Sequence, residues 1–419
     1  MKYMKILLLV ESLEINRTSS GIVSSNFINA IMDENHITCL STEKAHMAFP
    51  WLKDINIKII DFSNPTIFEK ILKKIPKVAA LPTYITGYSM AFNRLVNDWK
   101  KSIMEELSVN KYDLVIVLGT GSSFAPHFAM AEMMDTDVKW IANIHDPYPM
   151  SHYPEPYRKK DTIFYRHQVK RIERVFQQAT WVTFPSQRLL DWMSQYHPQL
   201  KDKSFILPHP EASFVGLPDA IEDKDVSLKK GKFNLLHAGS LLGPRDPKYL
   251  IKAFMRFVEE DSERKEKSVL NIIGKVAREH TGFEKEYETV KDNVNIMITR
   301  VSYKHSLELL KQADVLIILE AIAKNSPFMP GKLADYITAD KPILALTPKL
   351  SETSRLLGKD YLYMTQADKE DEIYRILVKL WKNWKIGNLN NLDRDDLREY
   401  ISSENINKIL MEHMNVHHG

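Results

Sequence analysis

A lysine and an aspartate, three residues apart, stand at the start of a predicted helix in the stretch SPFMPGKLADYITADKP, Ser326–Pro342. A Pro/Gly turn opens onto Lys332, and Asp335 follows about one helical turn later. The unpaired amides and the positive end of a helix N-terminus suit a phosphate. A carboxylate there can accept hydrogen bonds from a ribose diol. The pattern predicts a nucleotide site, but it also fits an ordinary βαβ connection in which Asp335 caps the helix or is solvated.

The stretch HAGSLLGPRDP, His237–Pro247, adds groups that suit a diphosphate. Gly239 permits a close approach of the backbone to a ligand, and Arg245 offers a fork of donors. A helix is predicted to follow from Pro247, which is favoured in a first turn. Together with Lys332, these residues predict a pyrophosphate clamp.

Two loops of the first half also follow predicted strands. In NIHDPYPMSHYPEP, His145 and Asp146 come directly after an apolar run, and a histidine at a cleft rim can donate to a sugar hydroxyl. In ESLEINRTSSGI, Gly21 leads into a helix, where backbone amides could meet a phosphate or a sugar. A histidine satisfied within the core and a well-capped flexible loop are the open alternatives. The G-x-G-x-x-G of a dinucleotide fold is absent.

Short apolar runs alternate with amphipathic stretches, which predicts βαβ units and mostly parallel sheets. This α/β pattern breaks at residues 216–231, a charged segment of little periodicity, and then restarts. We therefore predict two doubly wound, Rossmann-like domains, 1–215 and 232–392, that face a central cleft. A final helix, 393–414, is expected to pack back onto the first domain. The predicted strands are Lys5–Val10, Ile37–Leu40, Ile57–Asp61, Leu114–Leu118, Trp140–Ile144, Trp181–Phe184, Phe205–Leu207, Phe233–His237, Val269–Ile273, Val294–Ile298, Val315–Leu319 and Ile343–Leu346.

Composition sets limits on function. A chain of 419 residues with 44% hydrophobic and 26% charged residues is typical of a globular protein of more than one domain. A net charge of +3 is too small to indicate a nucleic-acid partner. The single cysteine, Cys39, excludes an internal disulfide framework and suits a reducing cytosol. Ile6–Val10 is expected to be a first strand and not a signal peptide. No apolar run is long enough to span a bilayer.

These motifs together resemble the retaining glycosyltransferases of GT-B architecture, and most closely the bacterial glycosyltransferase family four (group one glycosyltransferases). The resemblance covers essentially the whole chain and is strongest over Phe233–Leu346, in HAGSLLGPRDPKYLIKAF and SPFMPGKLADYITADKPILAL. It implies that the first domain binds the acceptor. The second domain would bind a nucleotide-diphosphate sugar, with UDP or GDP, as co-substrate and without a further cofactor.

The resemblance also implies roles for single residues. Gly239–Ser240 matches the glycine turn after the first strand of the donor domain. Arg245 and Lys332 match the basic pair on the diphosphate. His145 matches a histidine that meets the donor sugar, and Asp335 matches the ribose-binding carboxylate.

The sequence departs from the family at one pair of carboxylates. The family has two glutamates eight residues apart, but Pro327 stands eight residues before Asp335. Glu320 is the nearest carboxylate, seven positions before Pro327, and is the candidate substitute on the donor. The second member of the pair is an aspartate, which has a shorter reach.

The resulting expectation is sugar transfer to an acceptor hydroxyl with retention, in bacterial surface polysaccharide or glycolipid synthesis. Arg245, Lys332 and His145 would be the catalytic residues. No Asp-x-Asp follows a strand to hold a divalent cation, so metal independence is expected. A nucleotide-sugar 2-epimerase and a non-catalytic nucleotide-sugar-binding protein of a glycosylation complex remain the alternatives.

The acceptor side is expected to involve a saccharide or a lipid-linked acceptor. Two stretches, Ile75–Tyr88 and Tyr153–Tyr165, combine prolines, aromatic residues and lysines. The second continues into a basic helix. Such segments can rest on an anionic bilayer, so we expect a cytoplasmic protein that associates weakly with the inner face of the cell membrane. A solvated helix face beside a packed loop is the alternative. The basic residues are Arg166, His167, Lys170, Arg171 and Arg174.

Overall fold

The structure is a computed structural model. It describes residues 3–16, 18–42, 55–67, 81–121, 123–133, 137–212, 226–241, 243–275, 277 and 288–415. The chain divides into two compact units. Unit 1 comprises residues 1–153, 158–208 and 406–419, and unit 2 comprises residues 154–157 and 209–405. The chain first passes into unit 2 for the short segment 154–157, and it enters the main part of unit 2 between Pro208 and His209, ahead of the segment 216–231 that the sequence marks as a linker. Residues 216–225 of that segment lie outside the described residues.

Unit 1 contains a parallel sheet in the order β3-β2-β1-β4-β5-β6-β7. The order reverses between β1 and β4, where Leu8 pairs with Ile116. The strands are β1 Met4–Val10, β2 Asn35–Ser41, β3 Asn56–Ile59, β4 Leu114–Leu118, β5 Trp140–Asn143, β6 Trp181–Phe184 and β7 Ser204–Ile206. Each lies within two residues of its predicted bounds. Buried parallel strands such as β4 are continuous apolar runs, whereas β3, at the edge of the sheet, is partly exposed.

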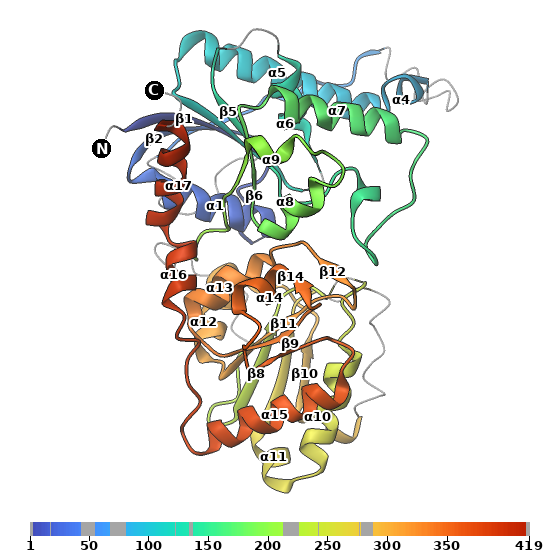
Figure 1. Ribbon diagram of the computed structural model, residues 1–419, viewed down its shortest axis with the longest axis vertical. Helices are drawn as coiled ribbons and strands as arrows, with labels where there is room; N and C mark the ends of the chain where they lie inside the picture. The colour runs from blue at the N-terminus through green and yellow to red at the C-terminus, as the bar shows by residue number, and fades with distance from the viewer. Residues whose placement is uncertain are drawn as a thin grey trace. The chain divides into compact units, whose positions relative to one another are not determined.

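Helices cover both faces of this sheet (Figure 1). On one face, Trp99 of α5 and Phe128 of α6 share a core with Leu7, Val115 and Phe176. The helices of unit 1 are α1 Ser19–Met32, α4 Leu81–Thr86, α5 Met90–Val109, α6 Ala125–Glu132, α7 Tyr165–Gln178, α8 Gln187–Met193 and α9 Leu200–Lys203, with a 3-10 turn at Met150–His152. The last helix, α17 Ser403–Asn415, belongs to unit 1 from residue 406 on.

Unit 2 repeats the plan with the order β10-β9-β8-β11-β13-β15, and its order reverses between β8 and β11. Phe254 of α10 and Trp381 of α15 pack on Leu235 and Ile317. The elements are β8 Phe233–Ala238, α10 Lys248–Glu259, α11 Ser262–Lys267, β9 Ser268–Ile273, a 3-10 turn Glu288–Val290, β10 Val294–Met297, α12 Tyr303–Gln312, β11 Val315–Leu319, β12 Asn325–Ser326, α13 Gly331–Ala339, β13 Ile343–Leu346, β14 Leu350–Ser351, α14 Glu352–Leu357, β15 Met364–Thr365, α15 Glu370–Lys385 and α16 Asp395–Ile401.

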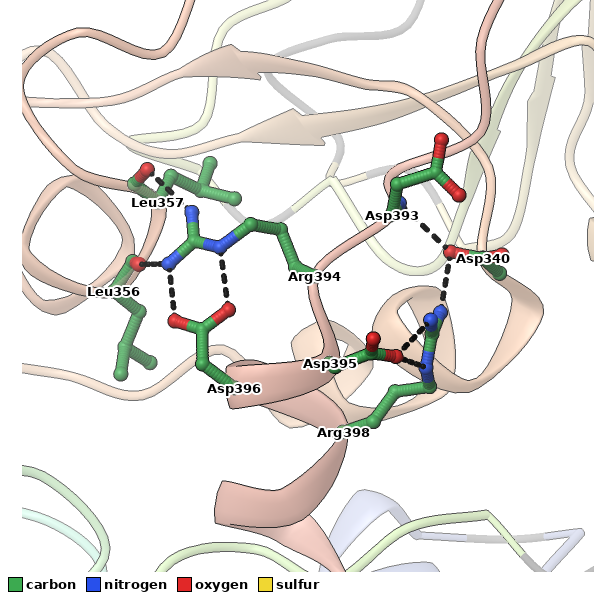
Figure 2. Close-up of polar contacts among 8 residues, drawn as sticks. All are labelled: Asp340, Leu356, Leu357, Asp393, Arg394, Asp395, Asp396 and Arg398. Carbon is green, nitrogen blue, oxygen red and sulfur yellow. Dashed lines mark hydrogen bonds and ion pairs between the residues drawn. The ribbon is translucent and has the colours of Figure 1, made fainter.

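The prediction of a single helix over 393–414 is wrong. The chain leaves the helical conformation at Ser402, where ψ is 150°, and this break separates α16 from α17. The first part, α16, belongs to unit 2, where two arginines hold it (Figure 2). Arg394 binds Asp396 and donates to the carbonyl oxygen of Leu357 at 2.7 Å. Arg398 lies 2.7 Å from the Asp340 carboxylate.

Candidate functional site

The loops after β8 and β9 lie in close contact at the carboxyl edge of the unit 2 sheet. In doubly wound sheets ligands bind at this edge, where the strand order reverses. A Cβ on Gly274 would lie 2.4 Å from the carbonyl oxygen of Gly239, and a Cβ on Gly239 would lie 2.5 Å from Nζ of Lys332. Both glycines have positive φ, which is 145° at Gly239 and 151° at Gly274. Neither position tolerates a side chain, so both glycines are needed for the close packing of these loops and of Lys332 against them.

Lys332 lies in the first turn of α13, and its Nζ is 3.2 Å from Nε2 of His237. His237 is completely buried, and its Nδ1 is 3.0 Å from the carbonyl oxygen of Ile317. Burial, assisted by the nearby Lys332 charge, holds the pKa of His237 well below its usual value. Burial also lowers the pKa of Lys332 to about 7; the Arg245 charge acts in the same direction and Asp335 opposes it.

Asp335 lies one turn later on α13 and accepts a hydrogen bond from the Tyr303 hydroxyl at 2.7 Å. Burial raises the pKa of Asp335 to about 7, although the Tyr303 hydrogen bond and the Lys332 charge act against this. Tyr303 begins α12, which Ser302 caps by accepting from the amide of His305. No local sequence pattern indicates this role of Tyr303, because α12 and α13 come together only in the fold.

Arg245 precedes α10, and its Nε donates to the Tyr157 hydroxyl at 3.3 Å. The ring of Tyr157 packs edge-on against Phe328, with centroids 5.6 Å apart. Unit 2 therefore brings together Gly239, Arg245, Lys332 and Asp335, as the sequence predicted for one wall of a site. Ser240 follows Gly239 in the same loop and is partly buried.

Glu320 follows β11 and is buried, with 5% of its surface exposed. Three hydroxyl groups donate to its carboxylate: Thr347 at 2.5 Å, Thr353 at 2.7 Å, and Ser326. These contacts join the loop after β11 to the segment after β13, and Pro327 lies buried within that loop. The contacts give Glu320 a structural role, and its contact with a donor stays a prediction.

Unit 1 has its own carboxylate where the strand order reverses. Glu11 follows β1 and accepts from the amide of Thr120 at 3.0 Å and from the Ser123 hydroxyl at 2.5 Å. Burial raises its pKa to about 7, against the hydrogen bonds, which lower it. The sequence carried the signal, a charged residue directly after an apolar strand, but Glu11 was not among the predicted site residues.

A buried histidine, His127, and a partly buried one, His145, lie near this edge of unit 1. His145 follows β5, and burial lowers its pKa to about 4. His127 of α6 lies 3.0 Å from the carbonyl oxygen of Asn143, and burial, with a smaller contribution from His145, lowers its pKa to about 3. Both imidazoles are therefore neutral at pH 7. The Asp146 carboxylate packs against Gly121, where an added Cβ would lie 2.1 Å from Oδ2.

Gly21 lies within the first turn of α1, which begins at Ser19, and does not precede the helix. Its amide donates to the Thr18 hydroxyl at 2.9 Å, which is the helix N-cap. A Cβ at this position would lie 2.4 Å from the carbonyl oxygen of Glu14. The glycine is thus needed for close packing of the loop after β1, and its amide already has an acceptor.

Two features are absent from the described residues. These residues contain no group of three or more His, Cys, Asp or Glu side chains placed to hold a metal ion. Within the same residues, no helix is both long and apolar enough to cross a membrane.

Solved structures with the same fold include glycosyltransferases of GT-B architecture. HepE of Anabaena, solved with UDP-glucose, is 12% identical with a TM-score of 0.61, over 99% of this chain and 100% of that one. A glycosyltransferase of Rickettsia africae is 10% identical with a TM-score of 0.63, over 99% and 98%. Trehalose-6-phosphate synthase of Burkholderia multivorans is 9% identical with a TM-score of 0.61, over 99% and 97%.

This chain therefore has the α/β fold of the GT-B glycosyltransferases. No protein-family model matches its sequence, and no curated protein does.

Proposed function

We propose that the protein transfers a sugar from a nucleotide-diphosphate sugar, with UDP or GDP, to an acceptor hydroxyl with retention. One observation carries the proposal: Lys332 and Arg245 bring two cationic groups to a glycine-lined edge of unit 2. Two cations that repel one another in a partly buried site are stabilised by an anion between them. Asp335, on the same helix, would accept hydrogen bonds from the ribose.

The proposed chemistry needs stabilisation of the leaving group. The bond between the sugar C1 and the β-phosphate oxygen breaks, and its electron pair stays on that oxygen. The acceptor oxygen bonds to C1 on the same face, and its proton passes to the departing phosphate. Arg245, Lys332 and the first amides of α13 would stabilise this negative charge, with no metal ion required. Preorganised donors of this kind contribute about 100- to 1000-fold in rate each.

The unit 1 site supports an acceptor role. Its neutral histidines, His145 and His127, and its carboxylates, Glu11 and Asp146, can exchange hydrogen bonds with hydroxyl groups but carry no positive charge to attract a phosphate. We assign the acceptor, a saccharide or a lipid-linked saccharide of bacterial surface polymers, to this unit. The contact of His145 with the donor sugar is part of the same proposal.

A panel of UDP- and GDP-sugars, incubated with the full chain and with saccharide or lipid-linked acceptors, tests the reaction. We expect release of the nucleoside diphosphate that depends on an acceptor, and a product whose anomeric configuration, by NMR, matches that of the donor. Conversion of the donor without an acceptor would instead identify an epimerase. Binding without turnover would identify a binding protein, in agreement with the missing glutamate at Pro327.

We also propose weak association of unit 1 with an anionic bilayer. Tyr84, Ile85 and Ile163 expose 58%, 65% and 75% of their surfaces. The Tyr84 ring packs edge-on against Phe164 at 5.7 Å, which places α4 beside the start of α7. Apolar side chains among cations suit an anionic membrane surface. The exposed lysines and arginines of this region are Arg158, Lys159, Lys160, Arg166, Lys170 and Arg174.

Arg171 does not belong to this surface, because it forms an ion pair with Glu132 at 2.7 Å and its guanidinium packs over the Phe128 ring at 4.7 Å. Residues 75–80 lie outside the described residues.

Sedimentation with vesicles of anionic and of zwitterionic phospholipid tests this surface. We expect binding to anionic vesicles at low salt only, and its loss in Ile85→Glu/Ile163→Glu. Ile386→Glu, which changes an isoleucine of unit 2 that is 72% exposed, is the matched control and should bind as the wild type does. Equal binding of all three proteins, or of none, would contradict the proposal.

A further inference from the structure

Lys332 and Asp335 are opposite charges three residues apart on α13, a spacing at which such side chains commonly form an ion pair. Both belong to the described residues, and no ion pair within 4.0 Å joins them there. Their charges do act on one another, since each shifts the pKa of the other toward its charged form. Something must therefore hold two attracting groups apart.

Each charge is held by a side chain from another element. A carbonyl oxygen can only accept, so Nδ1 of His237 carries the proton donated to Ile317. The neutral ring then presents the lone pair of Nε2 to Lys332, which donates to it at 3.2 Å. On the other side, the Tyr303 hydroxyl donates to Oδ1 of Asp335 at 2.7 Å.

We infer that Tyr303 is a positioning residue of the proposed donor site: its hydroxyl keeps the Asp335 carboxylate from neutralising Lys332, and so leaves the ammonium group to an anionic ligand. The inference rests on the proposed function. Tyr303 suits this task because its phenol donates one hydrogen bond and adds no charge. Its side chain is 4% exposed at the capped start of α12, so the hydroxyl has a fixed position.

This arrangement defines the ligand class more narrowly. A self-neutralised Lys332–Asp335 pair would have to be broken before a phosphate could bind. Held apart, the ammonium group offers donors to a phosphate, and the carboxylate offers acceptors to a pair of hydroxyls. A nucleoside diphosphate presents both kinds of group, whereas inorganic pyrophosphate uses only the first.

Calorimetric titration of the full chain with UDP, GDP and inorganic pyrophosphate separates these contributions. Tyr303→Phe should weaken pyrophosphate binding about tenfold, because the released Asp335 pairs with Lys332. Adding Asp335→Asn should restore pyrophosphate binding, because an amide cannot neutralise the lysine. Tyr361→Phe is the matched control: it also removes a buried hydroxyl of unit 2, one that donates to Ile343 at 2.9 Å, and it should bind as the wild type does.

Unchanged pyrophosphate binding in Tyr303→Phe would overturn the inference. So would a loss that persists when Asp335→Asn is added, since that result assigns Tyr303 a role in folding only. If the wild type binds neither nucleoside diphosphate, the proposed donor site itself is wrong and the inference falls with it. The wild-type titration thus distinguishes the two failures.

Discussion

The two units place different chemistry at the same position of the same sheet. In both, the strand order reverses beside a central strand, between β1 and β4 in unit 1 and between β8 and β11 in unit 2. In both, a buried glutamate at this edge accepts hydrogen bonds from neighbouring loops: Glu11 in unit 1 and Glu320 in unit 2. The shared glutamate therefore reflects how such an edge is held together.

The difference lies in the charges around these glutamates. Unit 2 adds Arg245 and Lys332, whereas the described residues near Glu11 are hydroxyls, Asp146 and two neutral histidines. The helix after β1 is capped by the Thr18 side chain, whereas α13 follows Pro330 and has no side-chain cap. The edge of the sheet is thus common to both units, and the two basic side chains distinguish unit 2.

The largest effect is expected where unit 2 differs from unit 1. Arg245→Ala and Lys332→Ala should each lower turnover of the nucleotide sugar at least about 100-fold, because each removes a charge that faces the leaving phosphate. Initial rates of nucleoside diphosphate release measure this loss. Lys382→Ala, on α15, is the control and should keep full activity with the same thermal unfolding. Undiminished turnover in both Arg245→Ala and Lys332→Ala would contradict the proposal that unit 2, unlike unit 1, binds the diphosphate.

Glu320, the glutamate at the edge of the unit 2 sheet, should stabilise the fold. Glu320→Ala leaves three buried hydroxyls without their acceptor, so we expect a loss of about 3 kcal/mol in the free energy of unfolding. Urea denaturation of the full chain measures it. Glu320→Gln, which keeps an acceptor oxygen, should lose less. Retained stability in Glu320→Ala, combined with lost donor binding, would instead make Glu320 a ligand contact.

The raised pKa of Glu11 should make the free energy of unfolding depend on pH. Its pKa is raised from 4.5 to about 7 in the fold, so the folded state binds more protons than the unfolded chain between these values. Stability from this group is therefore present below pH 4.5 and is lost as the pH rises to about 7. The shift corresponds to about 3 kcal/mol.

Glu11→Gln cannot ionise, so its stability relative to the wild type should rise by up to about 3 kcal/mol as the pH rises from 4.5 to about 7. Denaturation curves of both proteins across this range provide the test. Parallel curves, with a constant difference, would show that Glu11 titrates normally.

The smallest expected change in stability concerns the start of α1. Thr18→Ala removes the cap of α1 and should lower the free energy of unfolding by about 1 kcal/mol. Thr18→Ser keeps the hydroxyl and should differ little from the wild type. Urea denaturation detects the difference, and equal stability of the alanine and serine variants would mean that the cap contributes nothing.

The sequence predicted the fold well because buried parallel strands are continuous apolar runs, as in β4 and β11. The strands β12, β14 and β15 escaped prediction because each has only two residues. The break at Ser402 also escaped prediction, because the apolar pattern of Leu397, Ile401, Ile406 and Leu410 continues across it, and all four side chains are indeed buried.

The site was predicted in part. Residues close in sequence to a glycine turn, such as Arg245, or at a helix start, such as Lys332, have a local signal. The partners that fix their geometry do not: Tyr303 and His237 reach α13 from other elements, and only the fold places them there. The structural contacts of Glu320 were missed for the same reason, since its three hydroxyl donors are spread over 27 residues.

Hydrogen–deuterium exchange of the full chain with saturating UDP or GDP, without a sugar, tests the contrast between the units most directly. We expect slower exchange after β8, after β11 and in the first turn of α13, and unchanged exchange in residues 119–121 and 145–153 of unit 1. Slower exchange confined to the unit 1 segments would contradict the assignment of the nucleotide to unit 2, as would no change in either unit.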